Sequence, residues 1–220
     1  MSAGASRAES PAGGSLGVTL VEPYAKPAQQ READFLGMYL FLASEIMLFG
    51  AIFALLFFDR IRHPGAAEAA AVRLEIWIGT ANTAILLTSS LFVALAVLAA
   101  RHGRAGAVIR GLAAAALLGA AFMGLKGYEY YKDVADGVVP VIGRAVPSGL
   151  FINLYYAATV LHAVHLTVGV CLLTWAAVRI ASRRTRVPGQ AIVIEMTGLY
   201  WHFVDVVWVF LFPLLYLPRA

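Results

Sequence analysis

Apolar residues gather in five long segments along the chain, and short polar stretches separate them. The segments cover residues about 36–58, 76–99, 107–127, 150–178 and 196–217. At 1.5 Å of rise per residue, each segment is long enough as a helix to cross a hydrocarbon core of about 30 Å. The pattern therefore predicts an all-α fold, a polytopic membrane protein built as a bundle of five transmembrane helices, in one domain over residues 35–220.

Residues 1–34 differ from the rest of the chain. They are rich in Ala, Gly, Ser and Pro and contain no long apolar core, so they do not have the pattern of a signal peptide. We expect a disordered or extended tail here.

Composition supports a membrane protein. Hydrophobic residues make up 60% of the chain and charged residues 14%, whereas a soluble domain carries about 25% charge. The single cysteine, Cys171, excludes a disulfide within the chain and a multi-cysteine metal site. The net charge of +4 suits basic loops better than a surface for nucleic acid, so no nucleic-acid partner is expected.

The distribution of Lys and Arg predicts the orientation. With five crossings, ten of the 17 basic residues fall on the N-terminal side of the membrane and seven on the other. The cluster from Arg179 to Arg186, after the fourth segment, contributes most to this difference. Because positive charge favours the cytoplasmic side, we expect the N-terminus in the cytoplasm and the C-terminus outside.

Six ionisable side chains inside the apolar segments are the candidate functional residues. Such groups are costly in lipid, so they face protein or water and often mark a functional site. They are Glu45, His162, His165, Glu195, His202 and Asp205.

Glu45 lies near the middle of the first segment, where an acidic residue costs roughly 3 kcal/mol on insertion scales. Two interpretations are equally open. The carboxyl is proton-active or contacts lipid, or it is a protonated acid that is hydrogen-bonded to a neighbouring helix.

His162 and His165 lie one turn apart, and His202 and Asp205 repeat this spacing two turns after Glu195. Histidines invite a metal or haem interpretation. We favour hydrogen-bonded packing histidines over ligands, because no carboxylate or cysteine stands beside the first pair and two histidines one turn apart cannot ligate one haem from opposite faces. His202 and Asp205 either form a carboxylate-oriented histidine or clamp to His162 and His165. We favour the clamp, which predicts contact between the fourth and fifth helices.

Small residues predict close helix packing in the second and third segments. The second carries Gly79, Asn82 and Ser90 on one stripe, and the third carries Gly111 and Gly119. Lys126 and Glu129, three residues apart, are expected to form a structural pair at the membrane interface.

The segments resemble subunit III of the haem–copper oxidases. The resemblance rests on Gly37–Glu45, Asn82–Ser90, Glu129–Tyr131, His162–His165, Glu195 and Tyr200–Trp208. It implies an accessory subunit without haem, copper or catalytic residues of its own. Such a subunit packs beside the catalytic subunit I, which holds the haem and copper, and supports assembly and sustained turnover in respiratory electron transport. In several members it holds phospholipid.

The resemblance also places the candidate residues. Glu45 matches the family's buried carboxyl in a Ser-Glu motif, which is associated with carboxyl-reagent labelling and lipid contact. The other five candidates fall at polar motif positions of the family. The implied location is the inner membrane of a bacterium.

The chain departs from the longer members, which have seven helices, and resembles the short form that starts at the family's third helix. The ending Phe210–Leu217 resembles the branch associated with nitric oxide reductases, so an accessory subunit of such a reductase is the alternative. A rival from another class is a small proton-coupled transporter with Glu45, His202 and Asp205 as a relay. It is disfavoured because the segments lack paired Gly/Pro breaks. A haem-binding membrane enzyme is a third interpretation and would need axial ligands on facing helices.

Overall fold

The computed structural model describes residues 27–63, 65, 76–135, 150–185, 187–189 and 191–216. These residues form five helices and no strand: α1 (Pro27–Arg62), α3 (Ile76–Arg101), α4 (Ala105–Ala135), α5 (Leu150–Ala181) and α6 (Ala191–Tyr216). Each helix is long and apolar enough to cross a membrane. The all-α class and the five transmembrane helices expected from the sequence are confirmed.

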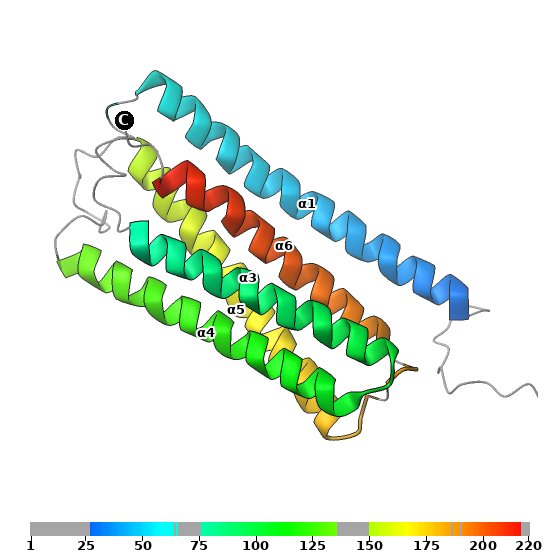
Figure 1. Cartoon of the computed structure of the whole chain (residues 1–220). Coiled ribbons are helices and arrows are strands. Elements are labelled where there is room, and N and C mark those ends of the chain that lie inside the picture. The colour runs from blue at the N-terminus through cyan, green and yellow to red at the C-terminus, as the bar shows by residue number, and fades with distance from the viewer. Residues whose placement is uncertain are drawn as a thin grey trace, which may run out of the picture.

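Successive helices run in opposite directions, as Figure 1 shows. The starts of α1, α4 and α6 therefore lie at one end of the bundle, which we call the Pro27 end, and the other end is the Arg62 end. Helices α3, α4, α5 and α6 form a ring in which each contacts two others, whereas α1 contacts only α5 and α6. The first helix thus lies against the outside of a four-helix ring (Figure 1).

Glycines allow the ring to close tightly around Trp201. A Cβ atom added at Gly119 of α4 would lie 2.7 Å from the indole of Trp201, and one at Gly169 of α5 would lie 2.8 Å from it. A Cβ atom at Gly111 would lie 2.9 Å from that of Ala96 on α3. The close packing predicted for Gly111 and Gly119 is confirmed, and it fixes α6 against α4 and α5.

The outer surface is apolar, as expected for a helix bundle that faces lipid. Trp77, Leu117 and Met47 are more than two-thirds exposed, on α3, α4 and α1. The core holds Trp201, Trp208 and Phe122, which are fully buried, and α1 adds Phe49 to it. Large apolar side chains therefore occupy both the interior and the exterior of the bundle.

Two helix starts differ from the expectation. Helix α1 begins at Pro27, so residues 27–34 are helical and do not belong to an extended tail, and α6 begins at Ala191. Proline is favoured in the first turn of a helix, and the glutamines and charged residues that follow are good helix formers. Hydropathy detects the part of a helix that lies in lipid and misses its polar turns. Residues 1–26 lie outside the described part of the chain.

Candidate functional site

Glu45 of α1 lies against His165 of α5. Glu45 Oε2 is 3.0 Å from His165 Nε2, and the two side chains are 16% and 14% exposed. The other ring nitrogen, Nδ1, lies 2.9 Å from the carbonyl oxygen of Leu161. Sequence reasoning had selected both residues without pairing them, and the structure gives the buried acid a partner on a neighbouring helix.

The geometry fixes how many protons this pair holds. A carbonyl oxygen only accepts, so Nδ1 of His165 carries a hydrogen and donates to Leu161. Nε2 then accepts a hydrogen bond from a protonated Glu45, or, in an imidazolium, donates one to a carboxylate. Either arrangement places one proton between the two side chains. The pair is therefore neutral overall, which suits its depth in the membrane.

The pair borders a cleft between α1 and the helices α5 and α6, in the half toward the Pro27 end. The cleft has a volume of about 910 Å³. Its walls are mostly apolar and include Phe41 from α1, Val168 from α5 and Met196 from α6. A cavity of this kind, with a few polar groups in apolar walls, is typical of a site for an apolar or amphipathic ligand.

Glu195 connects three helices at the Pro27 end. Its carboxylate is 3.0 Å from Nη2 of Arg31 on α1 and 2.8 Å from Nε of Arg101 on α3. The Glu195 side chain is 4% exposed and each arginine is 59% exposed, so two cations from the rim reach one buried anion. Sequence reasoning missed both arginines. Their shared position at one membrane end, level with Glu195, is the signal that points to them.

The expected clamp of His202 and Asp205 to His162 and His165 is wrong. His202 Nδ1 is 2.5 Å from Ser90 Oγ, so the imidazole of His202 is paired with α3 and not with a histidine of α5. Helices α5 and α6 do contact, as expected, and the hydroxyl of Tyr200 donates to the carbonyl of His165 at 3.1 Å.

His162 and Asp205 are buried without hydrogen-bond partners among the described residues. The ring of His162 packs against Phe122 of α4 and Trp208 of α6, with centroids 5.8 Å and 5.3 Å away. The packing interpretation of His162 fits this environment, although the histidine lies among aromatic rings and makes no hydrogen bond. The carboxyl of Asp205 lies close to Ser90.

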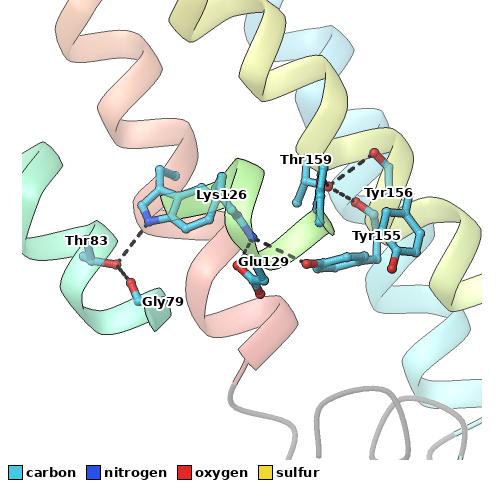
Figure 2. A network of polar contacts seen from close by, with 9 residues as sticks. Gly79, Thr83, Lys126, Glu129, Tyr155, Tyr156 and Thr159 are labelled. Atoms are coloured by element: carbon cyan, nitrogen blue, oxygen red, sulfur yellow. Dashed lines mark hydrogen bonds and ion pairs between the residues drawn. The ribbon is translucent and has the colours of Figure 1, made fainter. Parts of the chain in front are cut away.

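Lys126 joins α4 to α5 inside the bundle, and Figure 2 shows its contacts. Its Nζ lies 2.9 Å from Oε2 of Glu129 and donates to the hydroxyl of Tyr155 at 3.4 Å. The pair predicted from the three-residue spacing is confirmed. Both side chains are buried within the bundle.

Further polar contacts surround this pair. Trp208 Nε1 donates to Thr83 Oγ1 of α3 at 3.1 Å, and the hydroxyl of Tyr130 donates to Thr159 of α5. Lys126 Nζ also lies 5.2 Å from the ring centroid of Trp208. The network therefore ties all four helices of the ring together toward the Arg62 end (Figure 2).

The described residues contain no group of three or more His, Cys, Asp or Glu side chains placed to hold a metal ion. Glu45 and Glu195 pair between helices, and Glu45 and His165 line the cleft. Their geometry is suited to holding helices together and to contacting a ligand between α1 and the ring.

Comparison with known proteins gives a consistent result. Residues 27–218 match the family model described as cytochrome c oxidase subunit III. The chain is 32% identical to cytochrome c oxidase subunit 3 of Thermostichus vulcanus, over 83% of this chain and 86% of that protein. It is 30% identical to the probable cytochrome c oxidase subunit 3 of Nocardia farcinica, over 83% and 87%. It is 29% identical to the heme-copper oxidase subunit I+III of Aeropyrum pernix, over 82% of this chain and 22% of that protein.

Proposed function

The chain belongs to the cytochrome c oxidase subunit III family, and on this basis we propose that it is the accessory subunit of a respiratory haem–copper oxidase. In this role it carries out no redox chemistry and supports the assembly and stability of the catalytic subunit. The observation that carries the proposal is the family match over nearly the whole helical part of the chain, residues 27–218.

The partner in this proposal is subunit I, which holds the haem and copper. The relative from Aeropyrum pernix supports this choice, because its name describes subunits I and III in one chain. Fusion keeps two polypeptides at high effective concentration, which is useful when they work in one complex. Oxygen is the proposed substrate of the complex, because the relatives are named as cytochrome c oxidase subunits. Nitric oxide reduction and proton-coupled transport are not favoured by these names.

The proposed location is the inner membrane of a bacterium, with the N-terminus in the cytoplasm and the C-terminus outside. The excess of basic residues on the Pro27 side supports this orientation. Arg101 and Arg104 lie at this end, and so do Arg179, Arg183 and Arg184.

The cleft beside Glu45 and His165 is the proposed site of a bound phospholipid. Its apolar walls suit acyl chains, and its volume of about 910 Å³ is in the range of ligand pockets. The neutral Glu45–His165 pair contributes a polar contact without adding net charge to the site. This assignment gives the pair a structural role between α1 and α5 and a second role in contacting lipid.

The test of the accessory role is co-purification in a mild detergent. A tagged chain expressed in its own host is isolated, its optical spectrum is recorded, and the co-purifying subunits are identified by mass spectrometry. We expect a larger membrane subunit with haem absorption to co-purify. A colourless chain that purifies alone would argue against the accessory role, and a coloured chain alone would assign haem to this polypeptide. A co-purifying nitric oxide reductase subunit would change the substrate of the complex.

A further inference from the structure

Four side chains inside the ring carry polar atoms that no other described residue hydrogen-bonds. They are Asn82 of α3, His162 of α5, and Trp201 and Asp205 of α6, and together they hold seven such nitrogen and oxygen atoms. Asp205 is the most exposed of the four, at 4%. Polar atoms buried this deeply are hydrogen-bonded to protein or to ordered water in the large majority of proteins.

Contacts between α5 and α6 place three of these side chains along one strip of the interior. Trp201, Asp205 and Trp208 share a face of α6, at spacings of four and three residues. At one end of the strip, a Cβ atom added at Gly169 of α5 would lie 2.8 Å from the Trp201 indole. At the other end, the rings of His162 and Trp208 lie 5.3 Å apart. Trp201 and Trp208 are seven residues apart, so the strip extends about 10 Å along the helix axis.

Helix α3 contributes polar groups along the same strip. Trp208 Nε1 donates to Thr83 Oγ1, and Asn82 is the neighbouring residue, with a fully buried side chain. Two turns further along α3, Ser90 lies close to the carboxyl of Asp205. The four unpaired side chains therefore lie in the space that α3, α5 and α6 enclose.

The hydrogen-bonding abilities of these groups complement one another. The indole of Trp201 only donates, and the carboxylate oxygens of Asp205 accept. The amide of Asn82 does both, and a neutral imidazole of His162 has one nitrogen of each kind. A water molecule both donates and accepts, so it can bridge any two of them.

We propose that ordered water occupies this strip and joins Asn82, His162, Trp201 and Asp205 across the three helices. Buried water makes about three hydrogen bonds to polar groups, so about two or three molecules satisfy the seven atoms. The water continues the polar network of Lys126 through the interior of the ring toward Ser90.

Water fits this strip better than other ligands do. A side chain of another subunit cannot reach it, because the four helices enclose side chains that are at most 4% exposed. The ammonium of Lys126 already lies 5.2 Å from the ring centroid of Trp208, so a metal cation beside it would be repelled. An apolar ligand would leave the seven atoms unpaired.

Nuclear magnetic resonance of the ¹⁵N-labelled full chain in deuterated detergent tests this proposal, with water itself as the probe. Magnetisation transferred from water is observed at the indole N–H of Trp201, whose signal Trp201→Phe assigns. We expect a cross peak between water and this N–H. It should persist in Asp205→Asn and fall at least about threefold in Asp205→Leu, because leucine cannot hold a water molecule. No cross peak in wild type, or an unchanged one in Asp205→Leu, would overturn the proposal.

Thermal unfolding in the same detergent is an independent test, because asparagine and leucine have similar shapes. In a hydrated interior, Asp205→Leu should unfold about 2–4 °C below Asp205→Asn, since loss of a water bridge leaves neighbouring groups unpaired. Asn82→Leu should unfold below wild type by the same margin. Asn153→Leu, at an exposed position of α5, is the matched control and should unfold with wild type. In a dry interior the buried leucine variants would be the more stable ones, and that result would also overturn the proposal.

Discussion

Glu45 and His165 show how two ionisable side chains lie in a membrane bundle without a net charge. The hydrogen bond from Nδ1 to Leu161 leaves Nε2 as the atom that faces Glu45, so one proton serves both residues. Separated charges are costly in a medium of low dielectric constant. We therefore expect the neutral arrangement, in which the carboxyl of Glu45 carries the proton and donates to the imidazole.

This arrangement predicts different effects for two substitutions of Glu45. In Glu45→Gln, the amide N–H donates to Nε2 as the carboxyl does, so the thermal midpoint of the purified chain should stay close to wild type. In Glu45→Ala, Nε2 loses its partner, and unfolding should become easier by about 1–3 kcal/mol. Glu32→Gln, at an exposed position on α1, is the control. A Gln variant as unstable as the Ala variant would show that the pair exists as imidazolium and carboxylate.

At the scale of the helices, α6 is fixed by the fit of Trp201 between α4 and α5. Gly119 and Gly169 provide the space, since any side chain there would meet the indole within 3 Å. Three other glycines on α4 have nothing within 4 Å of an added Cβ: Gly106, Gly124 and Gly127. The same residue type therefore has two different roles on one helix.

At this scale we predict that two Gly→Ala substitutions on α4 change the free energy of unfolding in opposite directions. Gly119→Ala should destabilise the bundle by about 1–3 kcal/mol, because Trp201 and Val170 crowd the added methyl group. Gly124→Ala should be neutral or stabilising by up to about 1 kcal/mol, because alanine is the better helix former. Thermal unfolding of both variants in the same detergent compares them. Equal destabilisation by both would contradict the packing of Trp201.

At the scale of the whole molecule, the chain divides into a ring of four helices and one helix outside it. Helix α1 is held by the apolar contacts of Phe49 and Leu56 and by two polar contacts, Glu45–His165 and Arg31–Glu195. The ring has tighter packing and its own buried polar network. We expect α1 to be less stable than the ring and to open on its own.

Hydrogen exchange tests this division. Arg31→Gln removes one contact of α1, and amide exchange over residues 28–38 should accelerate about fivefold, while exchange in α3–α6 stays unchanged. Arg104→Gln, at an exposed position before α4, is the matched control and should change neither. Uniform acceleration across all five helices would contradict an independently opening α1.

The features predicted from the sequence are the local ones. The length of an apolar run is a property of each segment alone, so the sequence predicted all five helices. The three-residue spacing of Lys126 and Glu129 predicted their ion pair. Long-range partners were not found. Glu45 and His165 lie 120 residues apart, and Arg101 and Glu195 lie 94 apart. The partner of His202 was assigned to the wrong helix, because spacing shows which residues share a face and does not show what that face contacts.

The position of α1 has a consequence for how the chain is made. Its contacts are with α5 and α6, which follow α3 and α4 in the chain, and α1 has no contact with α3 or α4. Helix α1 therefore has no partner among the described helices until α5 and then α6 have been synthesised. Until then the contact of Glu45 with His165 and that of Arg31 with Glu195 cannot form. Among the described helices, α1 completes its packing only after α6 brings Glu195 between Arg31 and Arg101.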